Sequence, residues 1–180
     1  MTSISDRIAA LRASFDSRKT RPEKWRREQL YRLMTMIEEN ESAIHEALKA
    51  DLGKSGFEAR MTETGTVLSE IEHTLSKLKS WMRPTRFSTP LSNQPGRSKV
   101  VHEPLGVVLI VAPWNYPVNL VLTPLIGAIA AGNCAAIKPS EVSARTSELL
   151  ARLIPAYLDT DAFHVFEGGA DVSTELLEQR

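Results

Sequence analysis

Apolar residues recur every three or four positions along the first 82 residues of the chain, with charged residues between them. This spacing predicts amphipathic α-helices, because positions three and four apart lie on one face of a helix. The pattern favours one helix over 4–15, a second over 25–48 and a third over 57–82, which Pro84 ends. The apolar face of the third helix includes Phe57 and Met61. We interpret this part of the chain as a scaffold.

Beyond Pro84 the helical periodicity stops. Residues 84–96 contain three prolines, which predicts an extended connection. The following run, Val107–Ala112, is apolar throughout, as is typical of a parallel strand that is covered on both faces. Helix and strand patterns then alternate: a helix over 118–131, kinked or restarted at Pro124, a strand over 134–138, a helix over 143–158, a strand over 163–166 and a helix that opens near Asp171.

This order of elements predicts an α/β protein. Amino-terminal helices precede the first half, βαβαβ, of a doubly wound parallel sheet, which is the architecture of a dinucleotide-binding domain. We expect three parts: a helical segment over 1–83, an extended connection and strand over 84–104, and a partial dinucleotide-binding domain over 105–180.

Charge and cysteine content narrow the function classes. The chain has 22 basic and 22 acidic residues and a formal net charge of zero, so no overall charge attracts nucleic acid. A single cysteine, Cys134, cannot form an intrachain disulfide or a cysteine-based zinc cluster, and it favours a reducing, cytoplasmic location. The longest apolar stretch, 118–131, is shorter than the roughly 20 residues that span a bilayer. We expect no nucleic-acid partner and no membrane segment.

The most informative motif is PWNYP, residues 113–117, directly after the first buried strand. Ligands of open α/β sheets bind at this carboxyl end of the strands. The Asn115 amide can donate to an oxygen that becomes negative in a transition state, and loss of such a donor costs roughly 3 kcal/mol. Asn is also among the best helix N-caps, and the spacing alone favours that second interpretation.

A second motif, KPSE, follows the next strand at residues 138–141. The Glu141 carboxylate can accept hydrogen bonds from both hydroxyls of an adenosine ribose, and Lys138 can reach a ribose hydroxyl or a 2′-phosphate. The alternative is a surface ion pair, or a Glu placed at the start of a helix by the helix dipole. Taken alone, the motif favours the alternative.

Two further features have structural interpretations. The Gly168–Gly169 turn lacks the full G-x-G-x-x-G pattern, so we interpret it as a tight turn capped by Asp171, with Gly168 lining the adenine side of a nucleotide at most. Cys134 lies in a short apolar strand without a basic neighbour, which indicates core packing. The four histidines have no metal-ligand spacing, and we expect no metal site.

Taken together, PLGVVLIVAPWNYP, GAIAAGN, KPSE, the Gly-Gly turn and TELL resemble, in order and spacing, a class 3 aldehyde dehydrogenase. The segments FDSRKTRPEKWRREQL and LKADLGKSGFEA resemble the amino-terminal helices of that family, so the resemblance covers essentially all 180 residues. It implies oxidation of an aldehyde to a carboxylate with NAD(P)⁺. In that reaction a cysteine thiolate adds to the carbonyl, hydride leaves to the nicotinamide, and water hydrolyses the thioester.

The resemblance also assigns roles to residues of this chain. It implies that Asn115 is the oxyanion donor, that Lys138 and Glu141 contact the adenosine ribose, and that backbone around Ala112, Pro113 and Trp114 lines the dinucleotide. Glu141 favours NAD, because it accepts from the 2′-hydroxyl and repels a 2′-phosphate, whereas Lys138 leaves NADP open. The implied partners are a small-molecule aldehyde and, since relatives are commonly dimers, a second copy of the protein.

The 180 residues stop before the glycine-rich cofactor turn, the general-base glutamate and the nucleophilic cysteine of that family, and Cys134 occupies none of those positions. We therefore expect the chain alone to be catalytically incomplete. Two other hypotheses are a non-catalytic chain that binds nucleotide or co-assembles with an intact relative, and an unrelated α/β domain.

Overall fold

A parallel sheet of three strands lies at the centre of the computed structural model, which describes residues 3–179. The strand order is β3 (Val107–Val111), β4 (Cys134–Lys138), β5 (Phe163–Val165). β4 is the central strand and is buried along its whole length, whereas β3 lies at an edge and is half-buried. The predicted α/β class is confirmed, but the strand covered on both faces is β4 rather than β3.

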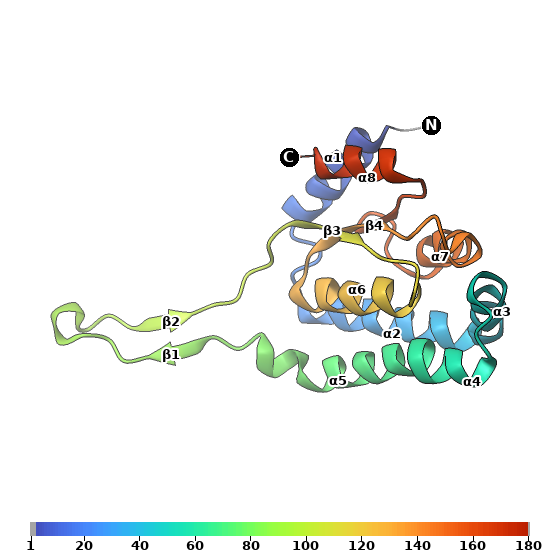
Figure 1. Cartoon of the computed structure of the whole chain (residues 1–180). Helices are drawn as coiled ribbons and strands as arrows, with labels where there is room; N and C mark the ends of the chain where they lie inside the picture. The colour runs from blue at the N-terminus through green and yellow to red at the C-terminus, as the bar shows by residue number, and fades with distance from the viewer. Residues whose placement is uncertain (1–2, 180) are drawn as a thin grey trace.

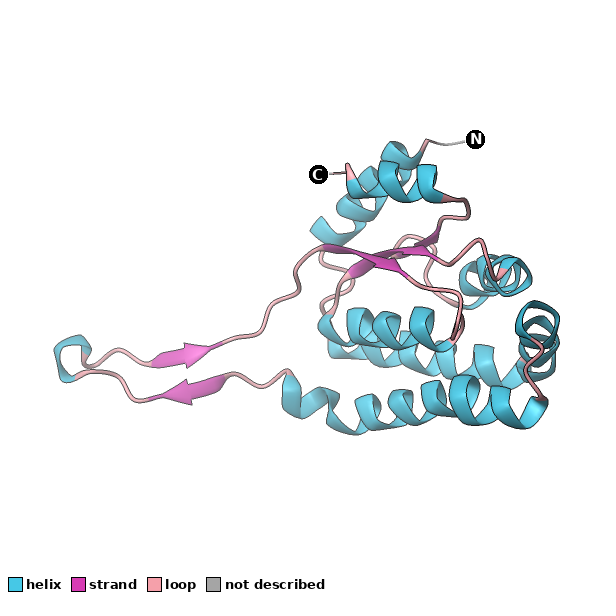
Figure 2. Ribbon diagram, in the orientation of Figure 1, coloured by secondary structure: helices cyan, strands magenta, loops and turns pink. Residues whose placement is uncertain are grey.

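Helices cover both faces of the sheet (Figures 1 and 2). α1 (Ile4–Asp16) packs across the strands on one side, and α8 (Ala170–Leu177) lies on that side as well. The crossover helices α6 (Asn119–Ala131) and α7 (Ala144–Tyr157) lie on the other side. α2 (Glu23–Glu39) packs against both crossover helices, and α3 (Glu41–Leu52) packs against α7. One buried apolar cluster therefore runs from the amino-terminal helices through to the sheet.

The helix predicted over 25–48 is two helices, α2 and α3, which break at Asn40. The Asn40 backbone leaves the helical region with φ −114° and ψ 15°. Its side-chain amide donates to the Met36 carbonyl at 2.9 Å and to the Tyr157 hydroxyl at 3.0 Å. Asn side chains satisfy backbone groups at helix ends in this way, and apolar periodicity does not detect the break.

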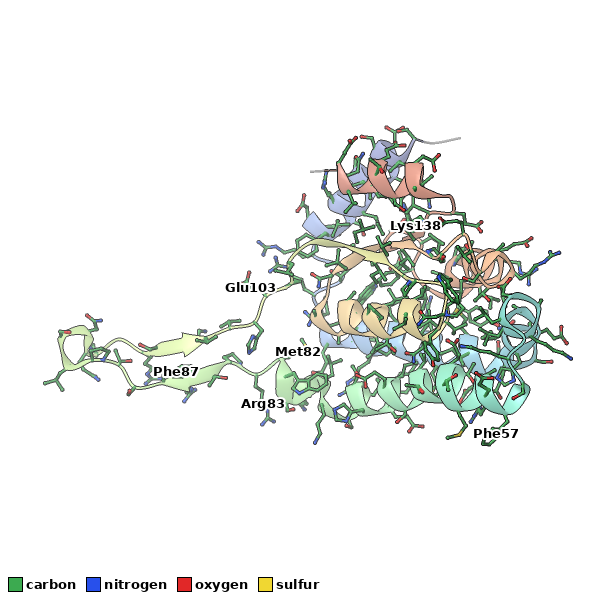
Figure 3. All side chains as sticks on the ribbon, viewed as in Figure 1. Phe57, Met82, Arg83, Phe87, Glu103 and Lys138 are labelled. Atoms are coloured by element: carbon green, nitrogen blue, oxygen red, sulfur yellow. The ribbon has the colours of Figure 1, made fainter. Side chains whose placement is uncertain are left out.

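The helix predicted over 57–82 is also interrupted. It consists of α4 (Gly56–Ala59), a π-helical turn η1 (Arg60–Thr64) and α5 (Gly65–Trp81). A π-turn adds a residue to the turn and so changes which side chains face inward. Phe57 and Met61, predicted to face the core, are 78% and 61% exposed, while Glu63 is buried. Figure 3 shows Phe57 at the outer surface of this segment.

The segment predicted as an extended connection contains an antiparallel hairpin of β1 (Thr85–Phe87) and β2 (Ser98–Val100). A short 3₁₀ turn, η2 (Leu91–Asn93), lies near its tip. The hairpin projects away from the rest of the molecule, and Phe87 is more than half exposed on it (Figures 1 and 3). Each strand has three residues, too few for an alternating pattern to predict the pairing.

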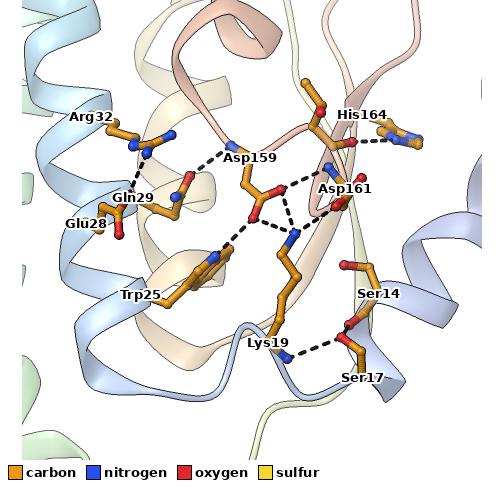
Figure 4. A network of polar contacts seen from close by, with 11 residues as sticks. Ser14, Ser17, Lys19, Trp25, Glu28, Gln29, Arg32, Asp159, Asp161 and His164 are labelled. Carbon is orange, nitrogen blue, oxygen red and sulfur yellow. Dashed lines mark hydrogen bonds and ion pairs between the residues drawn. The ribbon is translucent and has the colours of Figure 1, made fainter.

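A polar network around Asp159 ties the amino-terminal helices to the loop before β5 (Figure 4). The Asp159 carboxylate accepts hydrogen bonds from Lys19 Nζ at 3.0 Å and Trp25 Nε1 at 3.0 Å, and its backbone N–H donates to Gln29 Oε1 at 2.9 Å. Burial raises the pKa of Asp159, but the hydrogen bonds from Lys19 and Trp25 outweigh it and hold the pKa below its ordinary value.

We expect Asp159→Asn to lower the free energy of unfolding by about 1–3 kcal/mol near pH 7, because Lys19 and Trp25 lose a charged acceptor. A carboxyl group whose pKa is lowered in the folded state stabilises the fold at pH values above its ordinary pKa. This stabilisation is lost as the pH falls through the pKa of the folded state. The deficit of the variant should therefore shrink below about pH 4. Urea unfolding at pH 7 and pH 3.5 measures both effects.

Asp161→Asn is the matched control, because Asp161 contacts the same lysine but is 72% exposed. It should change stability by less than about 0.5 kcal/mol. Equal losses in the two variants would contradict a special role for the buried carboxylate.

Candidate functional site

The carboxyl ends of β3 and β4 lie side by side. Val111 pairs with Lys138 in the parallel register, and the Ala112 N–H donates to the Lys138 carbonyl at 3.1 Å. The turn that carries Asn115 and the turn that carries Glu141 therefore start from the same edge of the sheet. β5 ends at this edge too, since the Phe166 N–H donates to the Ile137 carbonyl at 2.8 Å.

Asn115 is exposed on the turn that precedes α6. The N-cap of α6 is Val118, so the interpretation of Asn115 as an N-cap is wrong. The first free amides of the helix, those of Val118 and Asn119, donate instead to Glu63 Oε2 at 3.1 Å and 2.8 Å. Because another residue satisfies the helix end, the Asn115 side chain is available at the surface, next to Trp114, which is half exposed.

Lys138 and Glu141 form an ion pair at the end of β4. Lys138 Nζ donates to Glu141 Oε2 and to the Pro139 carbonyl, both at 2.9 Å. The Lys138 side chain is 2% exposed and that of Glu141 is 50% exposed. The hydrogen bond from Lys138 holds the pKa of Glu141 below its ordinary value, so the carboxylate is ionised at neutral pH. Figure 3 labels Lys138, the last residue of the central strand β4.

The exposed side of this pair can accept hydrogen bonds. A half-exposed carboxylate presents acceptor oxygen to solvent, which suits the two hydroxyls of a ribose. Lys138 is buried beneath this carboxylate and donates to it and to the Pro139 carbonyl. The predicted ion pair is present, but it is not a surface pair, because its lysine is buried and only its carboxylate is exposed.

Gly168 is required by the turn after β5. Its φ is +145°, and a Cβ built there would lie 2.3 Å from Val172 Cγ2. The adjacent Gly169 is the N-cap of α8 without a side-chain hydrogen bond, and Asp171 lies inside the first turn of that helix. The interpretation of Asp171 as the cap is therefore wrong, while the tight turn itself is confirmed.

Two polar residues of the helical segment contact this site, and sequence reasoning missed them. Lys54 Nζ donates to the Asn115 carbonyl at 2.9 Å and to Glu63 Oε1 at 2.6 Å. The side chains of Lys54 and Glu63 are 7% and 0% exposed. In the sequence, Glu63 is marked only by its place between apolar positions. A regular α-helix would not direct Glu63 toward α6, and the sequence pattern does not predict the π-turn that does so.

Cys134 is fully buried in β4, as predicted for a core residue. Desolvation raises the pKa of its thiol to about 11, so the thiolate does not form at neutral pH. Among residues 3–179, the structure has no helix that is both long and apolar enough to cross a membrane.

The strand order and the polar edge define the first half of a doubly wound α/β nucleotide-binding fold. A family model described as "Aldehyde dehydrogenase family" matches residues 2–180. The chain belongs to the aldehyde dehydrogenase family, and the resemblance stated from the sequence is confirmed.

Relatives and solved structures agree with this assignment. Mouse "Aldehyde dehydrogenase family 3 member B3" is 44% identical over 98% of this chain and 37% of its own length. The Dictyostelium discoideum protein "Aldehyde dehydrogenase family 3 comG" is 48% identical over 94% of this chain and 36% of its own length. The structure described as "Substrate bound state of Staphylococcus Aureus AldH" has a TM-score of 0.95 and 42% identity over 98% of this chain and 39% of that chain.

A more distant structure shares the fold. Succinic semialdehyde dehydrogenase from Streptococcus pyogenes, described as in complex with NADP⁺, has a TM-score of 0.84 at 16% identity, over 98% of this chain and 38% of that chain. This chain thus spans less than two fifths of the length of the proteins named here.

The raised pKa of Cys134 predicts a loss of stability at alkaline pH. The unfolded thiol ionises near its ordinary value, about 8.5–9, whereas the folded thiol keeps its proton up to about 11. The unfolded state therefore binds fewer protons between these values, so stability falls as pH rises. Wild type should lose roughly 2–3 kcal/mol relative to Cys134→Ala between pH 8 and pH 11, in urea unfolding at matched pH. Parallel pH profiles of the two proteins would contradict the burial of the thiol.

Proposed function

We propose that these 180 residues are the part of an NAD(P)⁺-dependent aldehyde dehydrogenase that holds the adenosine half of the dinucleotide and supplies the oxyanion donor. The observation that carries the proposal is the parallel register of β3 with β4, which starts the Asn115 turn and the Lys138–Glu141 turn from one sheet edge. A bound dinucleotide would supply the hydride acceptor for a reaction in which an aldehyde and water become a carboxylate and two protons.

Asn115 donates its side-chain amide to the aldehyde oxygen as that oxygen becomes negative. The exposed position of Asn115 and the capping of α6 by Glu63 support this role, because neither the helix nor the core uses the amide. A preorganised donor of this kind lowers the barrier by roughly 3 kcal/mol in a water-excluded site.

Glu141 accepts hydrogen bonds from the adenosine ribose, and Lys138 holds the Glu141 carboxylate in place from below. This arrangement favours NAD⁺ over NADP⁺, since a 2′-phosphate would approach the exposed carboxylate. The backbone of Ala112, Pro113 and Trp114 lines the dinucleotide beside it, and Gly168 lies on the adenine side.

We further propose that the 180-residue chain by itself does not oxidise aldehydes. Its single thiol, Cys134, is buried and protonated at neutral pH and so cannot attack a carbonyl. A chain that binds nucleotide without turnover, or that assembles with an intact relative, is the second candidate, supported by the same buried thiol. The expected partners are a small-molecule aldehyde and a second copy of the protein, and the expected location is the cytoplasm.

Thermal melts with nucleotide test the adenosine site. NAD⁺ should raise the melting temperature of the chain, because a ligand that binds the folded state alone stabilises it. Glu141→Gln should weaken NAD⁺ binding by about tenfold, since a charged acceptor is lost. The variant should also have a smaller preference for NAD⁺ over NADP⁺. The matched control is Glu148→Gln, an exposed carboxylate on α7. Identical shifts in wild type and Glu141→Gln would contradict the role of Glu141, and no shift with either nucleotide would contradict the site.

An activity assay tests the proposed lack of turnover. The purified chain, incubated with an aliphatic or aromatic aldehyde and NAD⁺ or NADP⁺, should form no NADH or NADPH above the rate of an Asn115→Ala variant, as followed by the absorbance of the reduced nicotinamide. Turnover by wild type that Asn115→Ala lowers by 10²–10³-fold would support the oxyanion role and overturn the inactivity of the chain.

A further inference from the structure

Two buried charges in the helical segment have no proposed contact with the aldehyde or the dinucleotide. Lys54 and Glu63 form an ion pair of 2.6 Å, and their side chains are 7% and 0% exposed. An ion pair buried this deeply contributes little net stability, because desolvation offsets the attraction, and apolar residues of similar volume often serve a core as well. The other contacts of the pair therefore indicate what it does.

Glu63 holds the start of α6. One carboxylate oxygen, Oε2, accepts from the backbone amides of Val118 and Asn119 at 3.1 Å and 2.8 Å. The preceding residue contributes as well, because the Thr62 carbonyl accepts from the Asn119 side chain at 3.0 Å. Thr62 and Glu63 both belong to the π-helical turn η1, which directs Glu63 inward. Orphan amides of the first helical turn are satisfied here from another part of the chain.

Lys54 holds the other side of the same turn. Its ammonium donates to the Asn115 carbonyl at 2.9 Å and lies 4.1 Å from the centroid of the Tyr116 ring. Lys54 itself follows Gly53, which ends α3 in the left-handed conformation with φ +69°. The lysine is thus placed by the end of one helix, and the carboxylate by the next helical segment.

We propose that Lys54 and Glu63 are positioning residues for Asn115. The pair fixes the main chain of Asn115 on one side and the first amides of α6 on the other, with three residues between Asn115 and Asn119. The main chain that carries the Asn115 side chain is thereby fixed before substrate binds, and such preorganisation is the condition under which a donor of this kind is effective. This inference rests on the proposed function of Asn115.

Nuclear magnetic resonance of the ¹⁵N-labelled 180-residue chain tests the inference without any need for turnover. In Glu63→Gln and in Lys54→Met the side-chain amide signals of Asn115 should shift, and the amides of Val118 and Asn119 should exchange with solvent at least tenfold faster in Glu63→Gln. Glu28→Gln is the matched control, because it removes a carboxylate from an exposed ion pair with Arg32 on α2 (Figure 4). Unchanged Asn115 signals in both folded variants would overturn the inference.

Two further measurements separate positioning from a general structural role. Lys54→Arg keeps a charged donor, so its Asn115 signals should lie closer to their wild-type positions than those of Lys54→Met. If they do not, although the rest of the spectrum is unchanged, the positioning role is contradicted. Glu63→Gln is nearly isosteric, so it carries the test if Lys54→Met does not give a native far-ultraviolet circular dichroism spectrum.

NAD⁺ melts of the same variants distinguish this inference from the proposed function. Both variants should bind NAD⁺ within about twofold of wild type, because neither residue contacts Lys138 or Glu141. If wild type does not bind NAD⁺, the proposed function fails whatever the Asn115 signals do. If wild type binds NAD⁺ and the Asn115 signals are the same in all folded variants, the positioning inference alone fails.

Discussion

The parallel register between β3 and β4 is the constraint on which the candidate site depends. Residues that follow parallel strands leave from the same edge of a sheet, so Asn115 and Glu141 share an edge although 26 positions separate them in the sequence. The last hydrogen bond of this pairing, from the Ala112 N–H to the Lys138 carbonyl, lies directly before both turns. Antiparallel pairing would place the same two motifs at opposite ends of the sheet.

The amino-terminal helices complete the ends of the crossover helices. Neither α6 nor α7 has a side-chain cap of its own. Glu63 accepts from the first amides of α6, and Asp51 accepts from the Thr146 amide at the start of α7 at 2.8 Å. At the other end of α6, Arg26 donates to the Ala130 carbonyl at 2.8 Å. Because buried helix ends need such partners, the helical segment interpreted as a scaffold supplies hydrogen bonds that the helices of the α/β half require.

Patterns of short range predicted much of the fold, and long-range contacts account for what they missed. Periodicity and apolar runs identified β4, the alternation of strands and helices, and the α/β class. The same periodicity placed Phe57 and Met61 in the core, because no local signal marks the π-turn that exposes them. The N-cap interpretation of Asn115 was wrong for a related reason. Its competitor for the amides of α6 is Glu63, more than 50 residues away along the chain.

The charge arrangement at the edge of the sheet follows from unequal burial within one ion pair. The Lys138 ammonium is withdrawn from solvent, while half of the Glu141 side chain remains exposed. The exposed part of this ion pair is therefore more negative than the sum of its two charges. A neutral ribose hydroxyl gains from such a surface by donating to it, whereas a phosphate is repelled unless the lysine moves outward. Such a movement would break two hydrogen bonds of Lys138, which supports the proposal that the pair prefers a dinucleotide without a 2′-phosphate.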